Sequence, residues 1–182
     1  LTHGVHSRID ETVDQDIREI EAGNVYVNRN MIGAVVGVQP FGGHGKSGTG
    51  PKAGGPLYLY RLVRTDRDPS LTGETVPITF AALDALQAAL TQILDLTADQ
   101  RTLLLARLSG YRSRSPVCLE LRLPGPTGER NWLRFLPRGT VGCQAQSLQQ
   151  LIEQLAAAWA TGNRALLPDT DVGRRLVRTI DH

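Results

Sequence analysis

The stretch NVYVNRNMIGAVVGVQPFGGHGKSGTGPKAGG, residues Asn24–Gly55, decides how the rest of the sequence is interpreted. Its first five residues, Asn24–Asn28, predict a β-strand because three β-formers stand in a row. Glycine and proline then recur too often for regular structure, and glycine at that density is costly in chain entropy. Such a loop is favoured where the backbone turns sharply or lies close to a ligand or another segment. Amide groups such as those of Gly33 and Ala34 are then suitable donors to an anion.

Two other interpretations of this loop are weaker. A solvated linker is disfavoured because the loop contains several apolar residues: Val35, Val36, Val38 and Phe41. The tripeptide Gly45–Lys46–Ser47 resembles the end of a phosphate-binding P-loop, which also needs a glycine five positions before Gly45. That position is Pro40, which has no N–H group. We therefore predict an ordered, functional loop that does not bind a nucleotide phosphate.

The composition narrows the functional classes. The 182 residues carry a net charge of +2, with 21% charged residues, which gives no indication of nucleic-acid or membrane-surface binding. Cys118 and Cys143 lack CxxC spacing, so a zinc or redox site is not predicted, and we expect two buried thiols. No apolar run approaches the roughly 20 residues of a membrane span, and the sequence shows no signal-peptide pattern. We expect a cytoplasmic protein, and the sequence around Leu1 and His182 suggests a fragment of a longer chain.

The residues before the loop predict α/β architecture. Leu1–His6 is expected to form a strand, in which His3 and His6 point to opposite faces and cannot share a metal. Ser7–Ala22 is expected to form a helix with a capping box at Ser7 and Asp10 and a left-handed end at Gly23. One face of this helix is apolar: Ile9, Val13, Ile17 and Ile20. The acidic residues opposite are more typical of a solvated face than of a metal site.

The residues after the loop predict a second domain. Pro56–Val63 is expected to anchor the loop to a core, and the polar segment Arg64–Thr75 to be a linker. The predicted domains are therefore 1–63, a linker at 64–75, and 76–182. Helical and β periodicity then give, in order, helices Val76–Leu96 and Ala98–Leu108, strands Val117–Leu123, Trp132–Leu136 and Gly139–Cys143, helix Gln146–Thr161, strand Arg164–Leu167 and a helix starting near Val172. The two first helices pack within the chain or form a dimer seam, and the later elements suggest a βαβ unit with parallel strands.

The run Gly23–Leu62 resembles the C-terminal end of the aldehyde dehydrogenase module in the bacterial proline utilization A (PutA) family. The resemblance lies in Pro40–Phe41–Gly42–Gly43 followed by Lys46–Ser47–Gly48, and in the flanking segments Gly33–Gly37 and Gly48–Pro56, which are similar to the branch that oxidises glutamate γ-semialdehyde. It implies that Gly33 and Ala34 bind the substrate carboxylate through backbone N–H groups and that Phe41 packs on the aliphatic stem. It also implies that the cysteine nucleophile, the glutamate base and the NAD domain precede residue 1, so this segment contains no catalytic, cofactor-binding or metal residue and is inactive alone.

The second half is similar, more weakly, to the first βαβ unit of an aldehyde dehydrogenase cofactor domain, over Pro137–Cys143 and Ala157–Leu167. It differs from that pattern at the positions where the family has catalytic and cofactor-binding residues. Gln144–Ser147 replaces the catalytic asparagine motif, Pro168 replaces the ribose-binding lysine, and Asp171 replaces its glutamate partner. The resemblance implies a degenerate, non-catalytic domain that also includes Leu123–Asn131, covers an internal channel and supports assembly.

These observations predict an α/β fold: the C-terminal piece of an aldehyde dehydrogenase fold followed by a partial Rossmann-like domain. The resemblance implies a full-length protein that uses FAD and NAD to convert proline to glutamate, with neither cofactor bound by this segment. Its expected partners are glutamate γ-semialdehyde, the remainder of its own polypeptide and further copies of itself; nucleic acid would be bound only through an N-terminal domain absent here. The full-length protein is expected in the cytoplasm, free or peripheral to the inner membrane. The alternatives are a monofunctional aldehyde dehydrogenase of the same branch and a non-catalytic structural or oligomerisation module.

Overall fold

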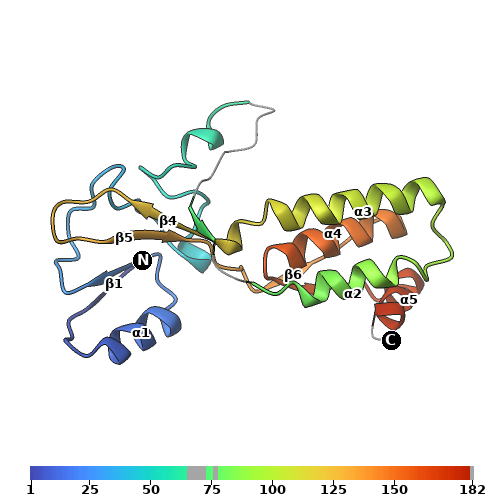
Figure 1. The fold of residues 1–182 in the computed structure, drawn as a ribbon, viewed down its shortest axis with the longest axis horizontal. Helices are drawn as coiled ribbons and strands as arrows, with labels where there is room; N and C mark the ends of the chain where they lie inside the picture. Colours follow the sequence, from blue (N-terminus) through green and yellow to red (C-terminus); the bar gives the residue numbers. More distant parts are fainter. Residues whose placement is uncertain (65–72, 76–77, 181–182) are drawn as a thin grey trace. The chain divides into compact units, whose positions relative to one another are not determined.

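A computed structural model describes residues 1–64, 73–75 and 78–180 of the chain (Figure 1). The chain forms two units, Leu1–Glu74 with Leu121–Leu133, and Thr75–Glu120 with Arg134–His182. The sequence-based ranges assigned residues 121–133 to the second domain, whereas the structure groups them with the first, where Glu129 contacts Arg29 and Gln39. Most of the predicted linker, residues 65–72, lies outside the described residues.

The first unit begins with a strand, a helix and a strand, as predicted. Strands β1 (Thr2–Val5) and β2 (Asn24–Val27) are parallel, with Thr2 opposite Asn24 and Val5 opposite Val27. Helix α1 (Asp10–Glu19) makes the crossover that parallel strands require. The α/β class is thus confirmed for this unit.

The predicted ends of helix α1 are wrong. Ser7 does not cap the helix, because its backbone N–H and C=O bond the side chain of Asn28 at 2.9 and 2.8 Å and its hydroxyl accepts the Ile9 N–H at 3.0 Å. The helix ends at Glu19, and Gly23 is not in the left-handed region. A Cβ at Gly23 would lie 1.9 Å from the Gly42 carbonyl oxygen. Glycine is therefore required at position 23 by a close backbone approach.

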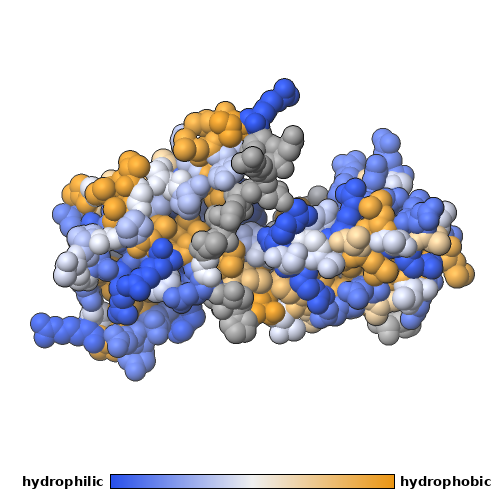
Figure 2. Space-filling model, turned by 45° about the horizontal axis from the view of Figure 1, so that its top comes forward, coloured by the Kyte–Doolittle hydropathy of each residue, from blue (hydrophilic) through white to orange (hydrophobic). Residues whose placement is uncertain are grey.

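The glycine-rich loop contains a short 3₁₀ turn, Gly45–Ser47, and a second one, Leu59–Arg61, follows the loop. The prediction that residues 56–63 anchor the loop to a core is wrong. Leu59 is 70% exposed, and its large apolar neighbours are exposed as well: Tyr58, Tyr60, Leu62 and Val63. Figure 2 shows several hydrophobic patches, coloured orange, on the visible face of the structure.

A three-stranded sheet has the order β3 (Glu74–Thr75), β4 (Leu119–Leu123) and β5 (Asn131–Arg134). Strand β4 starts two residues later than predicted, because Pro116–Cys118 forms a 3₁₀ turn and proline cannot donate to a strand ladder. The β4–β5 connection, residues 124–130, carries Glu129.

The second unit contains helices α2 (Ala81–Ala89), α3 (Ala98–Ser113), α4 (Leu148–Ala160) and α5 (Asp171–Ile180), with strands β6 (Thr140–Gly142) and β7 (Arg164–Leu166). Strands β6 and β7 are parallel, which confirms the predicted βαβ unit. Helices α3 and α4 lie side by side (Figure 1). A buried apolar cluster joins α2, α3, α4 and α5, with Leu86, Leu90, Leu104, Ile152 and Leu155 among its members.

Two helices differ in length from their predictions. Helix α2 ends at Ala89 instead of Leu96, and residues 76–77 of the predicted range lie outside the described residues. Helix α3 begins with a capping box of Thr97 and Gln100 and continues past Leu108 to Ser113. Among the helices that the structure describes, none combines the length and hydrophobicity that crossing a bilayer requires.

Candidate substrate-binding site

The glycine-rich loop is fastened to the start of β2 by two polar side chains. The Asn24 side chain donates to the Pro40 carbonyl at 2.8 Å and accepts the Gly42 N–H at 3.2 Å. The Lys52 ammonium donates to the Gly23 and Gly42 carbonyls at 2.5 and 3.0 Å. Burial lowers the pKa of Lys52, because the charged form is less well solvated there. Together these bonds hold the middle of the loop against the strand that precedes it.

The loop is also closed on itself by backbone bonds. Phe41 and Ala53 form an antiparallel bridge, with N···O distances of 3.0 and 2.9 Å. The Gly37 N–H donates to the Gly54 carbonyl at 2.9 Å. The segment from Gly33 to Phe41 is therefore ordered by local contacts despite its glycine content.

In the turn at residues 30–39, five backbone N–H groups have no acceptor among the described residues: those of Asn30, Met31, Gly33, Ala34 and Val36. The Ile32 N–H donates to the Asn30 side chain at 2.9 Å, and the Val35 N–H donates to the Gln39 side chain at 3.0 Å. Between them, the N–H groups of Gly33 and Ala34 have no acceptor among the described residues, and both residues are exposed. Gly33 has φ +82°, and a Cβ there would meet no atom within 4 Å. There is therefore open space beside the backbone at Gly33.

The predicted site residues fall into two places on this loop. Gly33 and Ala34 lie together on the exposed turn, and Phe41 lies at the Phe41–Ala53 bridge with 38% of its surface exposed. The arrangement can present two donors and one partly exposed aromatic ring to a ligand.

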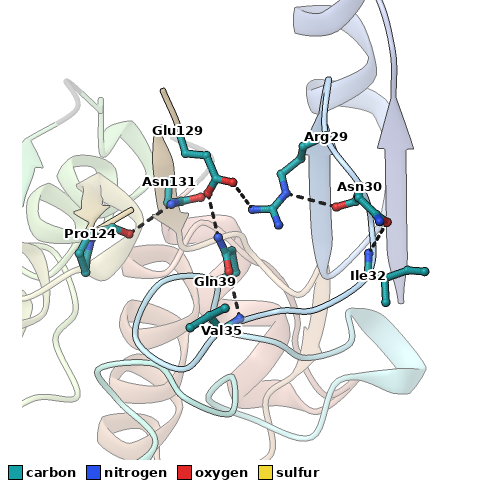
Figure 3. Close-up of polar contacts among 8 residues, drawn as sticks. All are labelled: Arg29, Asn30, Ile32, Val35, Gln39, Pro124, Glu129 and Asn131. Carbon is teal, nitrogen blue, oxygen red and sulfur yellow. Dashed lines mark hydrogen bonds and ion pairs between the residues drawn. The ribbon is translucent and has the colours of Figure 1, made fainter. Parts of the chain in front are cut away.

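Three residues that the sequence analysis did not single out support the turn (Figure 3). Gln39 is only 7% exposed, and its amide nitrogen donates to the Glu129 carboxylate at 2.9 Å. The other Glu129 oxygen lies 2.8 Å from an Arg29 guanidinium nitrogen. Periodicity cannot reveal this cluster, because Gln39 and Glu129 are separated by 90 residues and neither belongs to a motif.

Of the two thiols that were predicted to be buried, Cys143 is buried and Cys118 is only partly buried. Burial raises the pKa of the Cys143 thiol, so its reactive thiolate form is disfavoured. Within the described ranges, no group of three or more His, Cys, Asp or Glu side chains is placed to hold a metal ion.

The turn after β7 does not reproduce the cofactor-binding residues that the resemblance requires. Pro168 stands where a lysine would donate to a ribose, and its carbonyl instead accepts the Thr170 N–H at 2.8 Å. Asp169 and Asp171 are both paired with Arg174, at 2.5 and 2.7 Å. At this turn, Pro168 has no side-chain donor for a ribose hydroxyl, and both carboxylates are paired with Arg174.

Several known proteins are similar to this chain. Residues 1–66 match the aldehyde dehydrogenase family. The bifunctional protein PutA of Escherichia coli (strain K12) is 48% identical over 190 residues, covering 99% of this chain and 14% of that protein. PutA of Rhizobium meliloti is 48% identical over 167 residues, covering 90% of this chain and 13% of that protein. The chain therefore spans about one seventh of the length of these relatives.

Two further comparisons show how much of the chain a monofunctional dehydrogenase matches and which solved structure shares its fold. The 1-pyrroline-5-carboxylate dehydrogenase 1 of Halalkalibacterium halodurans is 52% identical over 59 residues, which cover 32% of this chain and 12% of that protein. The solved structure of PutA from Corynebacterium freiburgense matches with a TM-score of 0.66 at 28% identity, over 94% of this chain and 17% of that one. PutA proteins match almost the whole chain and the dehydrogenase only a third of it, so the chain is similar over nearly its full length to one segment of PutA.

Proposed function

We propose that the full-length protein is a bifunctional enzyme of proline catabolism that oxidises proline to glutamate through glutamate γ-semialdehyde. The names of its relatives, bifunctional PutA and 1-pyrroline-5-carboxylate dehydrogenase, support this proposal. FAD would serve the proline dehydrogenase step, and NAD, bound elsewhere in the polypeptide, would accept the hydride from the aldehyde carbon. The extent of the PutA match favours this proposal over a monofunctional dehydrogenase.

In this proposal the segment binds the end of the substrate that does not react. Glutamate γ-semialdehyde carries its carboxylate away from the aldehyde carbon. The free amides of Gly33 and Ala34 are the observation that supports the role, since consecutive unpaired N–H groups suit a carboxylate. Each hydrogen bond to a charged group contributes about 1.5–3 kcal/mol. The ring of Phe41 would pack on the aliphatic stem.

The second unit has a different role in this proposal. Its βαβ arrangement is that of a cofactor domain, yet the turn after β7 lacks the required donor. We therefore assign it a structural function, covering an internal channel of the full-length enzyme or supporting its assembly.

The test uses the full-length enzyme carrying Ala34→Asp, with Ala34→Asn as a control of the same size and no charge. The introduced carboxylate repels the substrate carboxylate and removes its binding energy. We expect KM for glutamate semialdehyde to rise about 10- to 100-fold with Ala34→Asp. KM for a short aldehyde that lacks a carboxylate should stay unchanged, and Ala34→Asn should have a small effect on both. An equal loss for the two aldehydes with Ala34→Asp would show that the loop is a scaffold.

A further inference from the structure

Gln39 links the loop to a distant hairpin through a side chain that is almost entirely buried. One end of its amide accepts the Val35 N–H at 3.0 Å, and the other end donates to Glu129 at 2.9 Å (Figure 3). The Val35 amide directly follows the two free amides of Gly33 and Ala34. A displacement of Gln39 would therefore change the course of the backbone at the proposed carboxylate site.

The orientation of the Gln39 amide is determined by its two partners. A backbone N–H can only donate, so it requires the amide oxygen. An ionised carboxylate can only accept, so it requires the amide nitrogen. Because Gln39 is 7% exposed, water is a poor substitute for either partner, and a missing bond would leave a buried polar group unsatisfied. Glu129 thus fixes which way Gln39 can point.

Glu129 is itself held in place. Its backbone N–H donates to the Pro126 carbonyl at 3.1 Å, and the nearby Asn131 side chain donates to the Pro124 carbonyl at 3.2 Å. Arg29 neutralises its charge through the 2.8 Å ion pair, and the Arg29 guanidinium lies 5.2 Å from the centre of the Tyr26 ring. The hairpin tip therefore presents a fixed, neutralised carboxylate to Gln39.

We infer that Glu129, on the β4–β5 connection, is a positioning residue for the substrate-binding loop. It orients Gln39, which holds the Val35 amide and thereby the Gly33–Ala34 donors in the conformation that receives the substrate carboxylate. The inference rests on the proposed function for the identity of the ligand. It makes the β4–β5 connection, which lies outside the aldehyde dehydrogenase match at residues 1–66, a determinant of substrate selectivity.

The test exchanges donor and acceptor in the full-length enzyme. Gln39→Glu alone places two carboxylates face to face and removes the donor between them. It should raise KM for glutamate semialdehyde about tenfold or more and leave KM for a short aldehyde without a carboxylate unchanged. Adding Glu129→Gln to Gln39→Glu restores one donor and one acceptor in reversed positions at the same net charge. The double variant should recover most of the lost affinity.

A matched control separates this contact from a general effect of the hairpin. Glu120 on β4 also pairs with an arginine, Arg134, at 2.6 Å, and its side chain is 25% exposed compared with 27% for Glu129. Glu120→Gln should leave both KM values unchanged. Amide hydrogen exchange of the full-length enzyme supplies a readout without substrate. Exchange across residues 29–39 should accelerate in Gln39→Glu and slow again in the double variant.

The outcomes distinguish this inference from the proposed function. If Ala34→Asp selectively raises KM for the semialdehyde but Gln39→Glu does not, the carboxylate site stands and the role of Glu129 is overturned. Failure of the double variant to recover affinity or exchange protection also overturns it. If Ala34→Asp affects both aldehydes equally, the proposed function fails, and unchanged exchange in Gln39→Glu would then overturn the positioning contact as well.

Discussion

At the scale of single residues, the charged side chain of Lys52 holds two backbone segments together. Its ammonium group donates to the Gly23 and Gly42 carbonyls and lies 3.5 Å from the Asn24 side-chain oxygen. These acceptors belong to the two backbone segments that approach most closely at Gly23. Removing the donor would leave partly buried carbonyl groups without a partner.

We expect Lys52→Met to destabilise this loop by about 1–3 kcal/mol, the usual cost of leaving such groups unsatisfied. Lys46→Met is the control, because Lys46 is an exposed lysine of the same loop. Urea unfolding of the two variants measures the difference. Equal effects of the two substitutions would show that the Lys52 contacts contribute nothing to stability.

The stability contributed at Lys52 should also depend on pH. Its folded pKa is lowered by burial, so the unfolded chain binds more protons at pH values between that pKa and the ordinary lysine value. Stability therefore rises with pH across that interval and is lost as pH falls through the folded pKa. The free energy of unfolding should therefore increase more steeply with pH in the wild-type protein than in Lys52→Met across this interval.

At the scale of elements, the end of helix α2 depends on a residue of helix α3. The last carbonyls of a helix have no partner within it. Here the Arg101 guanidinium donates to the carbonyls of Leu90 and Ile93, both at 2.9 Å, just after α2 ends at Ala89. The side chains of Leu90 and Ile93 are buried in the core of the second unit.

Arg101→Met should lower the free energy of unfolding by about 1–3 kcal/mol, because two carbonyl groups lose a charged donor. Arg107→Met is the matched control on the same helix. Arg107 makes a surface ion pair with Glu153 at 3.1 Å and is 46% exposed, so its loss should cost less than about 1 kcal/mol. Urea unfolding followed by circular dichroism measures both. A larger effect at Arg107 would contradict the capping role.

The elements were predictable where a repeated pattern extends over a whole segment. Alternation and helical spacing located β1, α1, β2 and the parallel β6–α4–β7 unit. Helix ends were less predictable because single side chains decide them. Ser7 had the chemistry of a cap but is bonded to Asn28 instead, and Arg101 of helix α3 donates to the carbonyls of Leu90 and Ile93, which follow the end of α2. Nothing local in the sequence distinguishes these choices.

At the scale of the whole chain, the buried core is distributed unevenly. Among the described residues of the first unit, the buried apolar side chains are Val5, Tyr26 and Leu121, whereas the second unit has a continuous cluster that spans four helices. Apolar residues of the first unit such as Ile32, Val36 and Leu59 are 70–83% exposed. Burial of apolar surface is the main favourable term in folding, so the two units should differ in stability.

Amide hydrogen exchange of this chain should therefore be slow in α4 and fast in β1, α1 and β2. The expected difference reflects local opening of a unit with few buried contacts. Comparison with the full-length enzyme is the control, because there the remainder of the polypeptide would cover the apolar surface and slow exchange in β2. Equal protection of α4 and β2 in the chain alone would contradict this view.

The candidate site was only partly predictable at this scale. Glycine density and the family resemblance directed attention to Gly33, Ala34 and Phe41, and their roles remain predictions. The support from Gln39 and Glu129 could not be predicted, because a polar contact between distant residues leaves no periodic signal. The sequence also did not reveal why glycine is present at each position. Gly33 has a positive φ and open space around it, whereas at Gly23 there is no room for a side chain.

The separation between Gln39 and Glu129 has a consequence for how the protein is made. A ribosome adds Gln39 to the chain 90 residues before it adds Glu129, whose carboxylate accepts from the Gln39 side chain. At usual rates of synthesis this interval lasts about 5–20 s. During that time the nascent loop can form its local bonds, such as the Phe41–Ala53 bridge, but not the contact with Glu129. The turn at residues 30–39 therefore gains its contact with Glu129 only after the β4–β5 connection has left the exit tunnel.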